Sequence, residues 1–370
     1  MNPLAAIAFT TAMTLSTHAA EVTFYLGTYT KSGRSQGIYQ GKLDTETGRL
    51  GAVELAGQAK DPSFLALTPR GDFLYAALEE GGGSVGAFAV EAQGKLRALN
   101  TLPCGPGTCH VWVDPTGSKV LAANYSGGSV AVFGTKADGS LAERTGFVQL
   151  EGRGPDPVRQ QKPFGHAIYT DAENRFAYVC DLGTDSVWVF QFDPEKGTLT
   201  PAASGPGKVP PGAGPRHLAI HPGGRFLYAA NELGLSVTAF ARDPGTGGLT
   251  PLATLPAIPE GAERKGASLA EIFLHPTGRW LYVSVRGHDS IAVYSVAADG
   301  TLTWLENAPA QVKVPRGFAI EQSGRWLIAA GQSDHRIAVL KIDPDTGKLT
   351  ATDQSATVGS PVCVIFAPAK

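Results

Sequence analysis

Short apolar runs recur along the chain, and each follows a turn. The clearest copies begin with a large apolar or aromatic residue and are rich in Leu, Tyr and Ala: 73–77, 120–124, 226–231, 280–284 and 326–330, with a looser copy at 176–180. A polar break and an alternating run follow each copy, at 84–88, 129–133, 186–190, 236–240, 290–294 and 336–340. Alternation of this kind, bounded by Gly, Pro, Asp and Ser, is typical of β-strands joined by tight turns. The pattern predicts an all-β protein built from repeated hairpins.

The turns give the length of the repeat. Equivalent turn positions are separated by 46, 57, 50, 54, 46 and 46 residues, and fall at Pro69, Pro115, Ala172, Pro222, Pro276, Gln322 and Pro368. A period of this length is typical of propeller blades, each a small antiparallel sheet. Six blades are therefore predicted to be complete between Pro62 and about Ala356.

The seventh blade is predicted to combine both ends of the chain. Residues 360–367 would supply its inner strand and residues 22–50 its outer strands, a closure that removes exposed sheet edges. A solenoid would need capping repeats, and a sandwich would not repeat six times at a fixed period. We expect one domain over residues 21–370, a seven-bladed β-propeller closed by N-terminal strands that join the C-terminal strand.

The first 20 residues stand outside this repeat. An apolar stretch from Leu4 to Leu15 is followed by small residues up to Ala20, as before a signal-peptide cleavage site. At about 12 residues the stretch is too short to span a bilayer, which takes about 20. The segment contains no Lys or Arg, so a wrongly assigned start codon is the alternative. We expect residues 1–20 to be a signal peptide and the protein to be periplasmic or secreted, or cytoplasmic if they are not.

Composition and charge narrow the possible partners. The chain is 43% hydrophobic and its formal net charge is −2, with no Lys/Arg run, so nucleic-acid binding is not expected. None of the four cysteines has metal or haem spacing, and we expect no metal, no cofactor and no membrane span. In an exported protein Cys104 and Cys109 could pair across a short loop, and buried free thiols are the alternative.

Equivalent positions of the inner strands line the central channel of a propeller, so residues can be compared from blade to blade. One ring of such positions is Ser63, Cys109, His166, Arg216, Ala270 and Arg316, and a second is Glu79, Tyr125, Leu182, Glu232, Arg286 and Gln332. In both rings the charged residues gather in the same part of the circle, from His166 through Arg316. A surface ion pair explains any one Arg taken alone, but buried charges are costly unless they are paired or used. Their agreement therefore predicts a site in the channel.

The residue types in these rings suit chemistry on an ester. Arginines can bind a carboxylate or phosphate and stabilise an oxyanion, and a His or Glu can move a proton. No Gly-x-Ser-x-Gly motif indicates a serine nucleophile. We interpret His217, His221 and His275 as turn or core residues. The predicted catalytic residues are His166, Glu232, Arg216 and Arg286, and the predicted substrate-binding residues are Arg316, His110, Glu271 and His288.

These residues also carry a resemblance. The chain resembles the lactonase family typified by the propeller-type 6-phosphogluconolactonase of bacteria and the fungal carboxymuconate lactonising enzyme. The matching segments are 25–30 with 36–39, 165–168 with 181–185, 214–222 with 228–232, 270–272 with 286–291, and 315–318. In the lactonising branch a His, an Arg, a Glu and a second Arg form the active site, which the resemblance places at His166, Arg216, Glu232 and Arg286. The family's usual His-Pro-His run is absent, because residues 163–166 read Pro-Phe-Gly-His.

We therefore expect a hydrolase that opens a sugar-derived acidic lactone, with His166 and Glu232 sharing proton transfer. Two alternatives stay open: a secreted propeller that binds a sugar acid or a protein partner without catalysis, and an enzyme that forms a lactone from a muconate-like diacid. Export would favour an unphosphorylated aldonolactone, because phosphorylated sugar lactones are made inside cells.

Overall fold

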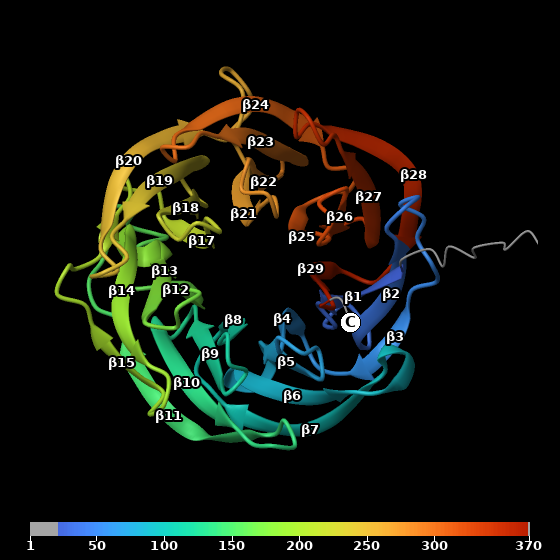
Figure 1. The fold of residues 1–370 in the computed structure, drawn as a ribbon, viewed down its shortest axis with the longest axis horizontal. Coiled ribbons are helices and arrows are strands. Elements are labelled where there is room, and N and C mark those ends of the chain that lie inside the picture. Colours follow the sequence, from blue (N-terminus) through green and yellow to red (C-terminus); the bar gives the residue numbers. More distant parts are fainter. Residues whose placement is uncertain (1–20, 369–370) are drawn as a thin grey trace, which may run out of the picture.

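The computed structural model describes residues 21–368, which form seven antiparallel sheets arranged as blades around a central axis (Figure 1). The candidate signal peptide, residues 1–20, lies outside the described residues. Within each blade the strands are hydrogen-bonded in order from the centre outward. The prediction of a seven-bladed β-propeller is confirmed.

Blades 1 to 4 follow one another along the chain. Blade 1 contains β4 (Pro62–Leu67), β5 (Phe73–Leu78), β6 (Ser84–Val90) and β7 (Leu96–Pro103). Blade 2 contains β8 (Thr108–Val113), β9 (Lys119–Asn124), β10 (Ser129–Thr135) and β11 (Leu141–Gln149). Blade 3 contains β12 (Gly165–Thr170), β13 (Phe176–Asp181), β14 (Ser186–Asp193), β15 (Thr198–Pro201) and the short β16 (Gly207–Lys208). Blade 4 contains β17 (Pro215–Ile220), β18 (Phe226–Asn231), β19 (Ser236–Arg242) and β20 (Leu249–Pro256).

Blades 5 to 7 complete the ring. Blade 5 contains β21 (Ser268–Leu274), β22 (Trp280–Arg286), β23 (Ser290–Val296) and β24 (Leu302–Pro309). Blade 6 contains β25 (Pro315–Ile320), β26 (Trp326–Gly331), β27 (Arg336–Ile342) and β28 (Leu349–Thr357). Blade 7 contains β29 (Pro361–Phe366), β1 (Glu21–Thr28), β2 (Gly37–Asp44) and β3 (Glu54–Gln58). Three short 3₁₀ helices are η1 (Glu80–Gly82), η2 (Ala92–Gly94) and η3 (Leu182–Thr184).

Blade 7 closes the ring as the sequence predicts, with one correction to its outer boundary. The inner strand β29 pairs antiparallel with β1, with Phe24 opposite Phe366 and Leu26 opposite Val364. The outermost strand β3 begins at Glu54, beyond the predicted limit at Leu50. Leu50 makes only an isolated bridge to β2, because the tight turn after β2 returns the chain for one residue before the outer strand starts.

A contact between neighbouring blades explains two features of the repeat. Gly300, in the β23–β24 turn, lies against the ring of Phe226, which begins the second strand of the preceding blade. A Cβ at Gly300 would come 2.2 Å from that ring, and its φ of 83° also favours glycine. Gly347 and Trp280 repeat the arrangement between blades 5 and 6. This contact explains why five of the seven second strands begin with an aromatic residue and why the turns that pack on them contain Gly.

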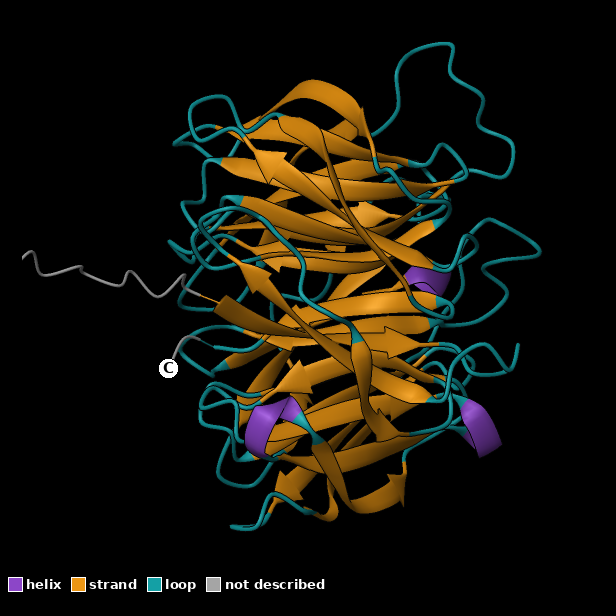
Figure 2. Ribbon diagram, turned by 90° about the vertical axis from the view of Figure 1, so that its right-hand side faces the viewer, coloured by secondary structure: helices purple, strands orange, loops and turns teal. Residues whose placement is uncertain are grey.

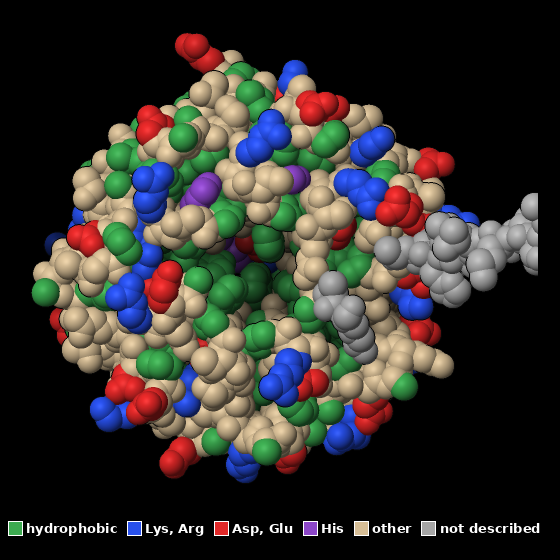
Figure 3. All heavy atoms as spheres, viewed as in Figure 1, with side chains coloured by type: hydrophobic (Ala, Val, Ile, Leu, Met, Phe, Trp, Pro, Cys, Tyr) green, Lys and Arg blue, Asp and Glu red, His purple; other side chains and the backbone are tan. Residues whose placement is uncertain are grey.

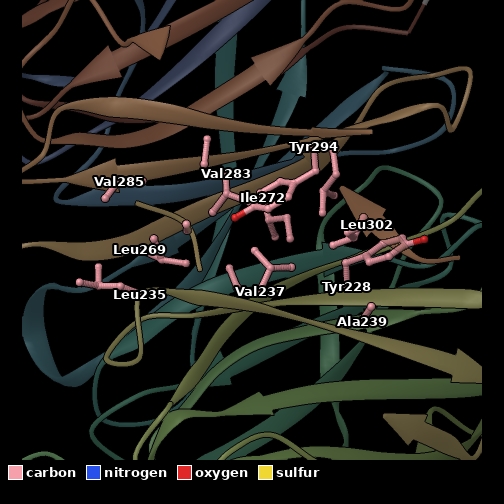
Figure 4. Close-up of a cluster of buried hydrophobic side chains, with 14 of the residues drawn as sticks. Tyr228, Leu235, Val237, Ala239, Leu269, Ile272, Val283, Val285, Tyr294 and Leu302 are labelled. Carbon is pink, nitrogen blue, oxygen red and sulfur yellow. The ribbon is translucent and has the colours of Figure 1, made fainter. Parts of the chain in front are cut away.

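The hydrophobic core is divided among the seams between blades. In Figure 4, Tyr228 and Val237 of blade 4 face Val283 and Tyr294 of blade 5, and all four side chains are buried. Similar clusters fill the other seams. Because the packing lies between blades, the axis is left free for a channel.

The two faces of the ring differ. Both ends of the described chain lie on one face, and the longest loops extend from the other (Figure 2). On the face that holds the chain ends, Figure 3 shows a central hollow lined mainly by hydrophobic side chains. A cavity of about 740 Å³ opens there, with Trp112, Tyr169 and Phe273 in its wall and Glu271 deep within it.

All four cysteines, which lie within the described range, are buried free thiols, so Cys104 and Cys109 do not form a disulfide. Among residues 21–368 no helix is long and apolar enough to cross a membrane.

Candidate active site

A bulge at the start of the inner strands aims the first ring of side chains. The pairing register shifts between Gly165 and Ala167, and in the same way between Pro215 and His217 and between Pro315 and Gly317. The residue within each shift is the predicted ring residue: His166, Arg216 or Arg316. A bulge places two residues opposite one and redirects a side chain, and bulges are common next to active sites. The ring is therefore a product of backbone geometry as well as of residue type.

Glu232, which directly follows β18, is the centre of the charged cluster. Its Oε2 lies 3.2 Å from Nε of Arg216 and 3.1 Å from Nη2 of Arg286, and its Oε1 lies 2.7 Å from Nη2 of Arg159. The guanidinium groups are aimed by backbone carbonyls: Arg216 donates to Ala270 O at 2.8 Å, and Arg286 donates to the adjacent carbonyl at 2.9 Å. The structure thus brings the predicted Glu232, Arg216 and Arg286 together at one mouth of the channel.

The charges of this cluster fix the state of Glu232. Burial alone would raise the pKa of its carboxyl, but the positive charges of Arg286, Arg216 and Arg159 outweigh burial and lower that pKa to about 2. The side chain of Glu232 is therefore a carboxylate at neutral pH. Burial, together with Arg216 and Arg316, lowers the pKa of Arg286 to about 10, which leaves it charged. The cluster carries an excess of positive charge, which suits an anionic group or a developing oxyanion.

Arg159 is a member of this cluster that the sequence analysis missed. It lies in the loop between blades 2 and 3, and its Nη2 also donates to Tyr125 OH at 3.3 Å. The loop is anchored by the next residue, Gln160, whose buried amide donates to Leu182 O at 2.8 Å and to Asp185 Oδ1 at 2.7 Å. The available signal was the 57-residue spacing between turn positions 115 and 172, the longest in the chain. That insertion carries Arg159 over the mouth.

Arg316 differs from Arg159, Arg216 and Arg286 because no carboxylate of the described chain lies at ion-pair distance from it. Within residues 21–368 no carboxylate forms an ion pair with it, and its guanidinium lies over the ring of Tyr29 at 5.5 Å. Tyr29 OH donates to Glu79 Oε1 at 3.0 Å. Arg316 can therefore accept a ligand anion without first breaking an ion pair.

His166 lies at the same mouth with its ring almost fully buried. Its ring centroid is 5.3 Å from that of Tyr125 and 5.2 Å from that of His217, and its Nδ1 lies 3.8 Å from the Cys109 thiol. Burial, followed by the charge of Arg216, lowers the pKa of His166 well below its usual value. The imidazole is therefore neutral at pH 7 and able to accept a proton.

A buried pair of residues lies deeper in the channel. Nδ1 of His217 and Oε1 of Glu271 are 2.8 Å apart, and both side chains are almost completely buried. The His217 ring is 5.3 Å from that of His110, whose Nδ1 accepts the Ile168 N–H at 3.4 Å. Nε2 of His110 and Nε2 of His217 have no hydrogen-bonding partner among the described residues. The structure thus buries the predicted His110 beside the His217–Glu271 pair, and Glu271 also lines the cavity on the opposite face. His217 is a buried core residue, one of the two possibilities that the sequence analysis gave for it.

His288, the remaining predicted residue, lies in the turn after Arg286. Its Nδ1 is 2.7 Å from Ser290 Oγ in the same turn, a contact that braces the turn carrying Arg286.

The described residues offer neither a thiolate nor a metal site. Burial raises the pKa of the Cys109 thiol to about 12, so this thiol is neutral. Within the described part of the chain, no group of three or more His, Cys, Asp or Glu is arranged to hold a metal ion.

We expect the buried histidines to make stability depend on pH. His110, His166 and His217 have pKa values well below 6.5 in the folded chain, so their stabilising effect is complete above about 6.5 and is lost as pH falls. Glu271 acts in the opposite direction, because burial raises its pKa from 4.5 to about 7 and its contribution is lost as pH rises through 7. Three groups outweigh one, so the free energy of unfolding should fall between pH 7 and pH 5, by up to about 1.4 kcal/mol per pH unit for each uncompensated histidine.

Urea unfolding from pH 5 to 7.5 measures this slope. Glu271→Gln removes the opposing contribution and should make the loss at acid pH steeper than in the wild type. Equal slopes in the two proteins would show that Glu271 titrates normally in the folded chain.

Comparison with known proteins adds independent evidence. The family model described as "Lactonase, 7-bladed beta-propeller" matches residues 23–366. A 6-phosphogluconolactonase of Bacillus subtilis is 36% identical over 346 residues, which cover 92% of this chain and 97% of that protein.

Solved structures agree with the sequence relatives. A Bacteroides fragilis protein described as a candidate 6-phosphogluconolactonase superposes with a TM-score of 0.88 at 33% identity, covering 95% of this chain and 99% of its own. The periplasmic gluconolactonase of Pseudomonas aeruginosa superposes with a TM-score of 0.87 at 29% identity, covering 94% and 99%. These names concern two lactones that differ by a phosphate group.

Proposed function

Because the chain belongs to the family of seven-bladed β-propeller lactonases, we propose that it is a hydrolase that opens a sugar-derived lactone at the charged mouth of its channel. The observation that carries this proposal is the cluster of Arg159, Arg216 and Arg286 around one carboxylate, beside a neutral imidazole. Such a site offers charge stabilisation and a proton acceptor, the two needs of ester hydrolysis without a covalent intermediate.

We assign stabilisation of the oxyanion to Arg216 and Arg286. When water attacks the lactone carbonyl, negative charge develops on the carbonyl oxygen, and donors already fixed in position stabilise it most effectively. Both guanidinium groups are held by backbone carbonyls of blade 5 and by Glu232. Little reorganisation is needed when that charge appears.

We assign proton transfer to His166. Its neutral ring would take a proton from the attacking water as the new C–O bond forms. When the tetrahedral intermediate collapses, the bond from the carbonyl carbon to the ring oxygen breaks, and His166 returns the proton to that oxygen. The products are the hydroxy acid and the regenerated enzyme, so atoms and protons balance.

Glu232 suits a positioning role in this scheme. With a pKa of about 2 its side chain holds no proton to donate at neutral pH. It would keep three guanidinium groups close together despite their mutual repulsion. Sequence reasoning gave Glu232 a share of the proton transfer, and the charges around it favour assigning that transfer to His166.

The experiment that tests the function is proton release by residues 21–370 on a panel of lactones. The panel contains gluconolactone, its 6-phosphate, galactonolactone and muconolactone, at a pH where spontaneous hydrolysis is slow. Enzymatic opening of one of them supports the proposal and identifies the substrate. A flat response from protein shown to be folded would reject it in favour of a propeller that binds a sugar acid or a partner. Accumulation of muconolactone from a muconate-like diacid would instead identify the lactone-forming reaction.

Export is part of this proposal. The Pseudomonas aeruginosa relative is named as a periplasmic protein, and residues 1–20 have the composition of a signal peptide. Expression of the full chain in a Gram-negative host, followed by fractionation and mass determination, tests it. A mature protein that begins near Glu21 in the periplasm is the expected result, and an intact chain in the cytoplasm would refute it.

A further inference from the structure

A second cavity opens on the same face as the charged cluster, at the side of the channel formed by blades 6, 7 and 1. Its volume is about 490 Å³, within the range of small-molecule sites. The lining residues are Tyr29, Lys31, Ser32, Glu79, Gln332, Ser333, His335 and Ser360. Tyr29 connects the cavity to the cluster, because its ring contacts Arg316 and its hydroxyl contacts Glu79.

The polar groups of this cavity suit a polyhydroxyl chain. Glu79 accepts one hydrogen bond at Oε1, from Tyr29, and its second oxygen has no partner among the described residues. The side-chain amide of Gln332 is likewise unpartnered there and can both donate and accept. The hydroxyls of Ser32 and Ser333 add two groups that can do the same. A carboxylate and an amide placed together can bind neighbouring sugar hydroxyls, each of which is both a donor and an acceptor.

The charges of the cavity do not suit a phosphate. Lys31 is compensated by the buried Asp61, whose Oδ2 lies 3.2 Å from Nζ. Nδ1 of His335 accepts the Ser360 N–H at 3.1 Å, which leaves that nitrogen without a proton to donate. A phosphate placed in the cavity would therefore meet the carboxylate of Glu79, and Arg316, the unpaired arginine beside Tyr29, is not one of the lining residues. Like charges brought together lower affinity.

We infer that this cavity is the subsite for the uncharged polyol chain of an aldonolactone, and that Glu79 selects against a phosphate at the end of that chain. The inference rests on the proposed function and names its substrate class: an unphosphorylated sugar lactone, with the reacting carbonyl at the arginine cluster and the hydroxyl-bearing chain toward Glu79. Arg316, between the two, would contact the ring of the substrate.

Two measurements test the inference. Calorimetry compares the binding of the product acids gluconate and 6-phosphogluconate, and initial rates compare the two corresponding lactones. For the wild type we expect a preference of at least about tenfold for the unphosphorylated ligand in both. Glu79→Gln should reduce that preference by about tenfold, and Glu79→Lys should reverse it, because the added cation would pair with the phosphate.

Glu80→Gln is the matched control. Glu80 is the next residue, it forms an exposed ion pair with Lys60 at 3.6 Å, and it lies outside the lining of the cavity. Its substitution should leave the preference as in the wild type. Thermal unfolding of the three variants checks that the Tyr29 contact is not needed for folding.

The outcomes separate this inference from the proposed function. If lactones are opened but the preference is the same in the wild type, Glu79→Gln and Glu79→Lys, the subsite is wrong and the lactonase remains. If no lactone is opened but the preference between the product acids follows the charge at position 79, the subsite stands as a binding site and the hydrolase is wrong. A wild type that prefers 6-phosphogluconate overturns the inference outright.

Discussion

Arg216→Ala is expected to lower kcat/KM for the lactone substrate by about 10²–10³-fold, the loss typical when one donor to an oxyanion is removed. Arg216 is 3% exposed, its Nη1 is held by Ala270 O, and its Nε faces Glu232. Water that fills the space cannot reproduce a charged donor that is already fixed in position. Because the interaction strengthens as the oxyanion forms, most of the loss should appear in kcat and less in KM.

The comparison variants are Arg216→Lys and Arg279→Ala. Lysine keeps the charge but not the planar fork, so we expect an intermediate rate. Arg279 is an exposed arginine that lies over the Trp280 ring at 4.3 Å, and its removal should leave the rate unchanged. Arg216→Ala leaves Glu232 paired with Arg286 and Arg159, so the variant should still fold. A kcat/KM within a few-fold of the wild type, in folded protein, would remove Arg216 from the chemistry.

The fold could be predicted from the sequence because its physical causes are local and repeated. In five blades an aromatic residue begins the second strand and packs against a glycine in a turn of the next blade, as Phe226 and Gly300 show. The chain therefore displays the same signals in most of its blades. The outer edge of blade 7 was harder to predict, because β3 packs on one side only and its sequence from Glu54 to Gln58 alternates weakly.

Only those site residues that occupy equivalent positions in several blades could be predicted from the sequence. His166 and Arg216 stand at equivalent positions of successive blades, as do Glu232 and Arg286 at a second position, and comparing the blades identifies all four. His217 is the core residue that the sequence analysis expected, but its pairing with Glu271 and its contact with the His166 ring could not be predicted, because they depend on the bulge between Pro215 and His217. Bulges change the facing of a side chain without leaving a reliable mark in the residue types.

Arg159 was missed for a different reason. It lies in a loop insertion that has no counterpart in the other blades, so no comparison between blades could identify it. Its place is set by tertiary contacts of its neighbour Gln160 with Leu182 and Asp185. The regular repeat thus supplies the residues to which we assign oxyanion stabilisation and proton transfer, and one insertion supplies the third guanidinium.

His166→Ala is expected to lower kcat/KM by about 10²-fold or more, the scale of general acid–base catalysis. The imidazole of His166 is uncharged at pH 7, because burial and the charge of Arg216 both lower its pKa well below the usual value. The pH dependence separates this role from a structural one. Wild-type kcat/KM should stay level from pH 8 down to about 6.5 and fall only at more acid pH, where His166 takes up a proton.

His221→Ala is the matched control for this prediction. His221 lies in the β17–β18 turn on the opposite face, where its Nδ1 accepts the Gly223 N–H at 3.0 Å, and its loss should change neither rate nor pH profile. In His166→Ala the fall in kcat/KM at acid pH should disappear along with the rate, since Glu232 is held by three guanidinium groups that lower the pKa of its carboxyl to about 2. If the variant is slow but its kcat/KM still falls at acid pH as in the wild type, the titrating base is another group. Substitution of the buried His217–Glu271 pair would then be the next experiment. Near-wild-type turnover would instead mean that the arginines alone carry the reaction, with hydroxide or bulk water as the proton acceptor.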